Sequence, residues 1–189
     1  MGTTRITCAE IQKHLPGAIL SLGYPDHMEG HVDLRGSTLT CVDIVAHRGM
    51  ERIVDLSVLQ DLGKFDLVLD SGTTEHCANI CNAYINAASA VKVGGHIIHE
   101  VPINMPNHGY WCISPVWFRD FYRANNFVIE RLDRTLSDIF DRSRVLPWPG
   151  GDCFAGLNIV PEVSCTLCVA RRTTDAPITI PKCQDIWLK

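Results

Sequence analysis

The sequence predicts an α/β fold in which a mostly parallel, seven-stranded sheet carries helices on both of its faces. Two observations predict it. Short apolar runs closed by turn residues alternate along the chain with longer segments of helical periodicity, a pattern typical of parallel sheets. The 189 residues are 46% hydrophobic and 20% charged, so they suit a single globular domain spanning residues 1–189.

The N-terminal segment, residues 1–17, predicts a short helix. Thr7 and Glu10 have the spacing of a capping box, in which a hydroxyl and a carboxylate bind free backbone N–H groups of the first turn. Pro16 and Gly17 are expected to end this helix. Seven strand-like runs follow, at residues 18–22, 38–45, 52–56, 65–70, 96–101, 127–132 and 164–170.

Two further helices are predicted between these runs. Residues 75–91 place apolar side chains on one face, and the pair Gly94-Gly95 is expected to end that helix. The next helix should begin at Ser114-Pro115 and run to residue 124, because a hydroxyl suits the N-cap and proline the first helical position. Residues 141–163 are rich in proline and glycine, so we expect a long loop there.

Composition and charge exclude several classes of protein. The formal net charge is −4, so the chain lacks the basic balance of nucleic-acid-binding proteins, and we expect no nucleic-acid partner. No apolar run approaches the roughly 20 residues of a membrane-spanning helix, and we expect no membrane association. Nine cysteines without a recognisable export signal indicate reduced thiols, so we expect a cytoplasmic protein.

The central part of the chain carries a motif that extends over several elements. Residues 65–79 read FDLVLDSGTTEHCAN, and residues 91–95 read VKVGG before a further apolar run. This arrangement resembles class I S-adenosylmethionine-dependent methyltransferases, in which an FDLV-type strand is followed by Glu-His, a helix and an LKPGG-type turn. The resemblance extends over residues 18–132 and implies a Rossmann-like fold that binds S-adenosylmethionine.

The resemblance also implies which residues bind the cofactor, at the carboxyl ends of the strands. Asp43, 20 residues after Gly23, would accept hydrogen bonds from both ribose hydroxyls, because a carboxylate has two acceptor oxygens. Asp55 would accept from the adenine amino group, and Gly23 would let the backbone approach the ligand closely. The remaining expected cofactor-binding residues are Asp70 and Ser71, beside the sulfonium, and His76.

The glycine-rich loop departs from the pattern of that family. The family's loop has the form DxGxGxG, whereas residues 21–27 read SLGYPDH, so only Gly23 survives. Pro25 stands in the place of the second glycine, and proline has neither a backbone N–H to donate nor a free φ. The methionine end of the cofactor would therefore need other partners, for which Asp26 and His27 are the candidates.

Histidines follow the fifth predicted strand, on the side where the cofactor is expected. Methyl transfer from a sulfonium requires alignment of the acceptor and removal of its proton. His108, which precedes Gly109, is the predicted catalytic base, because histidine titrates near neutrality and a loop residue can face the pocket. His99 is an alternative base, and either histidine could be only a hydrogen-bonded loop residue. Tyr110 and Trp111 could form the acceptor wall or pack in the core.

Cysteine and histidine spacings could indicate a metal site. Cys165 and Cys168 have the spacing of a zinc or redox pair, but they lie in a predicted strand, where residues three apart point to opposite faces. Cys77 and Cys81 could join His76 as ligands on a helix, although nothing else in the sequence completes such a set. We therefore expect no metal site.

The sequence thus predicts an S-adenosylmethionine-dependent methyltransferase that acts on a small-molecule or sugar-like acceptor, with O- and N-methylation left open. The alternative is a catalytically inactive protein that keeps the fold as a binding or partner module. The loop around Pro25 favours the alternative, whereas the acids Asp43 and Asp55 favour the enzyme. No Asn/Asp-Pro-Pro-aromatic motif follows the fourth strand, which argues against methylation of nucleic-acid bases. The oligomeric state is left open.

Overall fold

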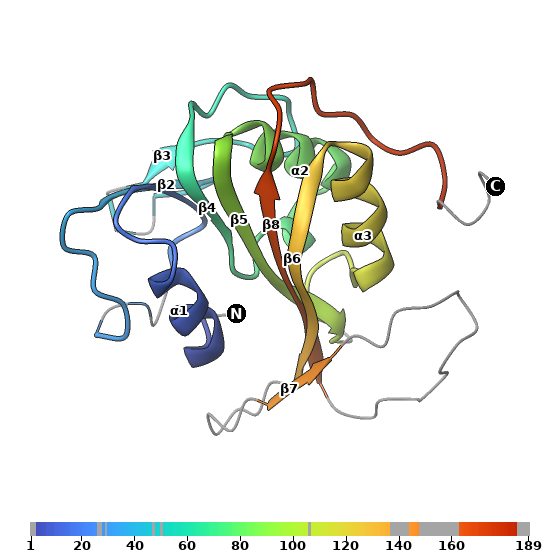
Figure 1. Cartoon of the computed structure of the whole chain (residues 1–189), viewed down its shortest axis with the longest axis horizontal. Helices are drawn as coiled ribbons and strands as arrows, with labels where there is room; N and C mark the ends of the chain where they lie inside the picture. The colour runs from blue at the N-terminus through green and yellow to red at the C-terminus, as the bar shows by residue number, and fades with distance from the viewer. Residues whose placement is uncertain are drawn as a thin grey trace.

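The computed structural model describes residues 3–25, 28, 30–46, 48–49, 51–105, 107–136, 144–147 and 163–184. They form an eight-stranded sheet in the order β3-β2-β1-β4-β5-β8-β6-β7 (Figure 1). The strands are β1 (Ala18–Leu22), β2 (Thr38–Asp43), β3 (Arg52–Ile53), β4 (Phe65–Asp70), β5 (Val91–Asn104), β6 (Phe127–Leu136), β7 (Arg144–Pro147) and β8 (Ser164–Arg172). The helices are α1 (Arg5–Gln12), α2 (Ile80–Ser89) and α3 (Pro115–Ala124), with a 3-10 turn, η1, at Thr74–His76.

The sheet is mixed, which corrects the predicted mostly parallel arrangement of seven strands. β1 to β5 pair in parallel, whereas β8 pairs antiparallel with both β5 and β6, and β7 pairs antiparallel with β6. Antiparallel neighbours need no helical crossover, so the alternation of strands and helices could not reveal them. β7 lies inside the predicted loop 141–163, and the rest of that loop, apart from residue 163, lies outside the described residues.

Helices cover both faces of the sheet, as predicted (Figure 1). On one face, α2 and α3 form a core cluster that includes Tyr84 and Phe118. On the other face, α1 contributes Ile11 to a second cluster. Successive residues of a strand point to opposite faces, so Ile97 of β5 belongs to the first cluster and Ile98 to the second. The α/β Rossmann-like architecture is therefore confirmed.

Helix α1 begins earlier than predicted. Its N-cap is Thr4, whose hydroxyl accepts a hydrogen bond from the Thr7 amide, so the predicted N-cap at Thr7 is wrong. The Thr7 hydroxyl instead donates to the buried carboxylate of Glu100 in β5. The capping-box spacing was present in the sequence, but a tertiary contact uses the Thr7 hydroxyl.

The predicted helix at 75–91 is divided into η1 and α2. Asn79 caps α2 by accepting from the Asn82 amide, so the helix begins at Ile80, five residues later than predicted. The glycine pair that was expected to end the helix lies inside β5. A Cβ on Gly95 would stand 2.8 Å from the Asp66 carbonyl oxygen, so glycine is required where β5 passes close to β4.

Of the other elements, some agree closely with the sequence, β2 and β3 are shorter than predicted, and β5, β6 and β8 are longer. The Ser114 hydroxyl accepts from the Val116 amide and Pro115 takes the first turn of α3, as predicted. β2 ends at Asp43, and β3 is only two residues long. Asp43 is therefore the last residue of β2, and Asp55 lies two residues after the end of β3.

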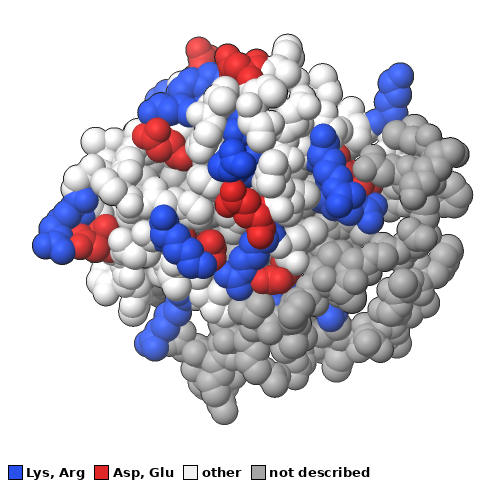
Figure 2. Space-filling view, viewed as in Figure 1, with Lys and Arg blue, Asp and Glu red and all other residues white. Residues whose placement is uncertain are grey.

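The described surface carries charges of both signs. On the face shown in Figure 2, acidic and basic side chains lie beside one another. Arg131 binds Glu10 at 2.7 Å, and Arg171 binds Glu130 at 3.0 Å, so basic groups here are paired with acids. Within the described residues, no helix combines the length and the apolar character needed to span a membrane.

Candidate functional site

A cavity of about 480 Å³ opens at the carboxyl ends of β2, β3 and β4. Open α/β sheets bind their ligands at this edge, because polar groups that end neighbouring parallel strands converge there. Three of the predicted cofactor-binding residues line the cavity: Asp43, Asp55 and His76. Gly72 and Thr73, from the turn after β4, complete its floor. The volume is within the range of roughly 300–1,000 Å³ that is usual for small-ligand sites.

Each of the two acids is held by the backbone that follows it. The Asp43 Oδ1 accepts from the Ile44 amide at 2.7 Å, and the Asp55 Oδ1 accepts from the Ser57 amide at 2.8 Å. Asp43 is half-buried and Asp55 is exposed. These short-range bonds orient both carboxylates at the cavity wall, where they can serve as fixed acceptors for a ligand.

Asp70 has a different position from the one expected. Its carboxylate is buried, accepts from the Thr73 and Thr74 amides at 3.2 and 3.1 Å, and lies 2.7 Å from the Nδ1 of His99. Burial would raise the pKa of Asp70, but the hydrogen bonds with His99 and Thr74 outweigh burial and lower it. Asp70 thus holds the turn after β4 and is not among the described residues that line the cavity.

His99, the alternative base, lies in the core. It has no exposed surface, and its two ring nitrogens contact the Asp70 carboxylate and the Tyr122 hydroxyl. Both nitrogens are therefore engaged away from solvent, and His99 cannot reach a ligand in the cavity.

Gly23 adopts the left-handed backbone that the loop needs, with φ +73°. A Cβ there would stand 2.5 Å from the Thr73 hydroxyl, which donates to the Leu22 carbonyl at 2.7 Å. The space beside Gly23 is thus filled by Thr73. Ser71 is half-buried and is not among the described lining residues. Residues 26–27, the proposed substitutes for the missing glycines, lie outside the described residues.

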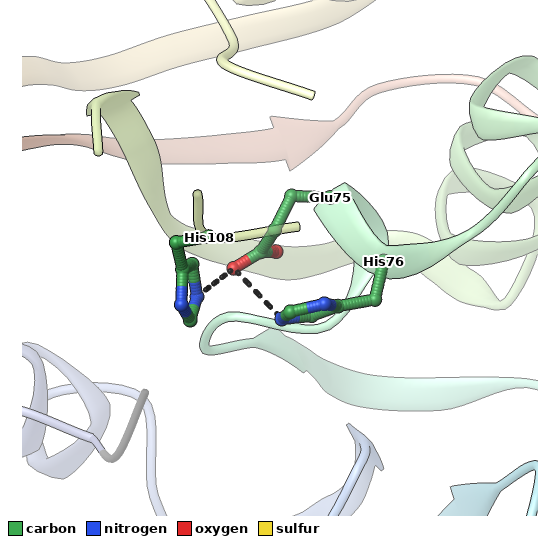
Figure 3. A group of neighbouring side chains, drawn as sticks. All are labelled: Glu75, His76 and His108. Carbon is green, nitrogen blue, oxygen red and sulfur yellow. Dashed lines mark ion pairs between the residues drawn. The ribbon is translucent and has the colours of Figure 1, made fainter. Parts of the chain in front are cut away.

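Glu75, His76 and His108 form a cluster at the edge of the cavity (Figure 3). Glu75 Oε1 lies 3.4 Å from the Nε2 of His108 and 3.8 Å from the Nε2 of His76. The Glu75 side chain is fully buried, whereas that of His76 is 49% and that of His108 28% exposed. Burial, together with the charge of Asp70, raises the pKa of Glu75 to about 8. Burial also lowers the pKa of both histidines.

The loop after β5 is attached to this cluster through its backbone. The amides of Tyr110 and Trp111 donate to the Glu75 carbonyl at 2.8 and 3.2 Å, and the indole N–H of Trp111 donates to the Cys77 carbonyl at 2.9 Å. Tyr110 lines the cavity, as expected of an acceptor wall. Trp111 is 42% exposed, so packing in the core is wrong for this ring.

Glu75 is the residue whose position the sequence analysis did not anticipate. It belongs to the Glu-His pair of the motif, but sequence alone does not show that its carboxylate is buried while its histidine neighbour faces the cavity. The signal that could have found it is the Glu-His pair together with a loop histidine, His108, after the next strand.

Neither a family model nor a curated protein matches the sequence. Solved structures do match it. The 1,6-didemethyltoxoflavin-N1-methyltransferase of Burkholderia thailandensis, bound to 1,6-didemethyltoxoflavin and S-adenosylhomocysteine, has a TM-score of 0.60 and 18% identity, and covers 88% of this chain and 76% of its own. The N-methyltransferase NodS of Bradyrhizobium japonicum, with S-adenosylhomocysteine, has a TM-score of 0.59 and 11% identity, and covers 90% and 86%.

A third similar structure, the [4+2]-cyclase SpnF, has a TM-score of 0.60 and 14% identity, and covers 90% of this chain and 81% of its own. Identities this low show a shared fold and nothing finer. The resemblance to class I S-adenosylmethionine-dependent methyltransferases is thus confirmed at the level of the fold.

Proposed function

We propose that the protein is an S-adenosylmethionine-dependent methyltransferase that acts on a small-molecule acceptor. One observation carries the proposal: the cavity at the carboxyl edge of the sheet places Asp43 and Asp55 on one wall, in a fold shared with methyltransferases that bind S-adenosylhomocysteine. Fold alone would not suffice, because one fold serves many functions. The two acids at this edge could accept hydrogen bonds from a nucleoside ligand.

The donor and acceptor groups of the cavity fit the nucleoside part of the cofactor. Asp43 would accept from the ribose hydroxyls and Asp55 from the adenine amino group, since ionised carboxylates only accept hydrogen bonds. Gly72 and Thr73 would border the methionine part. Asp70, which was expected to contact the cofactor, would act by holding that turn through the Thr73 amide.

Methyl transfer requires few chemical groups from the protein itself. S-adenosylmethionine, when bound, would supply an activated methyl group on sulfur for transfer to an acceptor oxygen or nitrogen, and its sulfur would keep the electron pair. The chain must align the acceptor and accept its proton. His108, predicted as that base, stands beside His76, which lines the cavity. Tyr110 would contact the acceptor.

One observation favours a second candidate, a protein that binds a ligand in this fold without methyl transfer. Pro25 replaces a glycine of the loop that holds the methionine end in the family. The similar structure of SpnF is described as a [4+2]-cyclase, so the fold does not by itself entail methyl transfer.

Calorimetric titration of the full chain with S-adenosylmethionine and with S-adenosylhomocysteine tests the proposal. We expect saturable heat with both ligands. The absence of heat from either ligand at millimolar concentration would refute the enzyme. Incubation with methyl-labelled S-adenosylmethionine and a small-molecule extract then separates the two candidates: label in an acceptor supports the methyltransferase, and binding without transfer supports the second candidate.

A further inference from the structure

Three side chains from two separate segments converge beside the cavity (Figure 3). Glu75 and His76 come from η1, and His108 comes from the loop after β5. One ligand atom from each lies within 4.8 Å of the other two. A zinc ion holds nitrogen and oxygen ligands at about 2.0–2.2 Å, so tetrahedral ligand atoms lie about 3.4 Å apart. The contacts of 3.4 and 3.8 Å to Glu75 Oε1 are close to that spacing.

The Glu75 carboxylate makes ion-pair contacts with the two histidines but no hydrogen bond within the described residues. Its side chain has no exposed surface, and neither of its oxygens has a hydrogen-bond partner within the described part of the chain. The buried Nε2 of His108 is unpartnered in the same sense. Buried polar atoms are nearly always satisfied, so these three atoms indicate a missing ligand that they share.

The backbone holds these ligand atoms in place. The Tyr110 and Trp111 amides both donate to the Glu75 carbonyl, which fixes the loop that carries His108 onto η1. Gly109 makes this close approach possible, because a Cβ there would stand 2.8 Å from the Glu75 Cγ. These main-chain contacts hold the loop that carries His108 against the segment that carries Glu75 and His76.

We propose that Glu75, His76 and His108 bind one divalent transition-metal ion, with Zn²⁺ as the ion best suited to their two nitrogens and one oxygen. Three protein ligands leave a fourth position open, which is the arrangement of catalytic zinc sites. His76 and Tyr110 both line the cavity, so that open position faces it. This proposal departs from the expectation that the chain has no metal site.

The ion would give His108 a role other than that of a base. An imidazole nitrogen that holds a cation cannot also accept a proton, so His108 would be a ligand. An ion at this edge of the cavity would bind an acceptor oxygen directly and make its proton easier to remove. That last role rests on the proposed function, whereas the ligand set rests on the geometry alone.

The test measures Zn²⁺ binding to the chelator-treated full chain by calorimetry. We expect one equivalent bound through this cluster, and at least about 100-fold weaker binding in His76→Ala and in His108→Ala, since losing even a residue that only supports a ligand costs roughly 10- to 100-fold. His31→Ala is the matched control, because His31 is an exposed histidine outside the cluster. His76 is half exposed, so its replacement leaves the core intact. Thermal unfolding checks each fold.

Two results would overturn the inference. One is that the wild-type chain binds no Zn²⁺. The other is that His76→Ala and His108→Ala bind Zn²⁺ as the wild type does, which would show that the ion binds elsewhere on the chain. A Co²⁺ titration gives a separate readout: absorption from cobalt–thiolate bonds would refute the set of two histidines and one glutamate. Titration with S-adenosylhomocysteine in the same samples keeps the proposed function distinct, since either ligand can bind when the other does not.

Discussion

Replacing Asp43 with asparagine tests the cofactor site directly. The Asp43 Oδ1 accepts from the Ile44 amide at 2.7 Å, and asparagine keeps an oxygen for that bond, so the turn after β2 should survive. The variant loses the negative charge and presents an NH₂ donor where the ribose hydroxyls need an acceptor. Losing a hydrogen bond to a charged group costs about 1.5–3 kcal/mol. We therefore expect the Kd for S-adenosylhomocysteine to rise roughly 10- to 150-fold.

Calorimetric titration of wild type, Asp43→Asn and Asp61→Asn provides the measurement and its control. Asp61 is exposed to solvent and, like Asp43, accepts from a backbone amide of its own turn, that of Gly63 at 3.0 Å, but it is not among the described residues of the cavity. Asp61→Asn should bind like the wild type. If Asp43→Asn folds normally and binds S-adenosylhomocysteine with unchanged affinity, the assignment of the nucleoside to this wall is wrong.

Three further predictions concern stability, measured by urea denaturation. Gly23→Ala should lower the free energy of unfolding by more than the roughly 1–2 kcal/mol that a left-handed backbone costs, because the added Cβ would clash with Thr73. Gly94 has φ +84° and nothing within 4 Å of an added Cβ, so Gly94→Ala should show the backbone cost alone. Burial raises the pKa of Glu100, so the folded state binds its proton more tightly and this carboxyl should lower the free energy of unfolding as pH rises above about 4.3. Glu75 contributes a fall of the same sign, so Glu100→Gln should make the slope of stability against pH less steep without abolishing it, and an unchanged slope would contradict this. Tyr122→Phe should lower the free energy of unfolding by about 1–3 kcal/mol, because it leaves the buried Nε2 of His99 without its partner. An unchanged midpoint of urea denaturation would refute this prediction.

The positions of the strands could be predicted because the signals are local. Each of the seven predicted runs overlaps an observed strand, and residues 65–70 coincide with β4. A short apolar run with glycine or aspartate at its end is recognisable without knowledge of its neighbours. The signal for the start of α3 is equally local, since Ser114 and Pro115 meet the stereochemical needs of a helix N-terminus.

The direction and number of the strands could not be predicted in the same way. β8 lies between β5 and β6 and runs antiparallel to both, a choice made by pairing partners that are distant in the sequence. The Gly94-Gly95 pair illustrates the same limit. Its spacing suits a helix end, but the close approach of the Asp66 carbonyl requires a glycine within β5.

In the candidate site, the sequence indicated two acids that line the cavity, and the tertiary structure decided which other polar groups face it. Asp43 and Asp55 line it as their positions after β2 and β3 suggested, because strand ends lie at a defined edge. Asp70 turns into the core instead, toward His99, and Gly23 lies against Thr73. No local pattern in the sequence indicates any of these contacts.

The sequence by itself determined the positions of seven of the eight described strands, the start of α3 and the residues that end the central strands, since propensity, periodicity and capping act over a few neighbouring residues. Only the tertiary structure decided the antiparallel entry of β8 and the meeting of Glu75 with His108, 33 positions apart. Such contacts depend on how loops return to the sheet, and burial then sets the charge and the partners that each side chain must have.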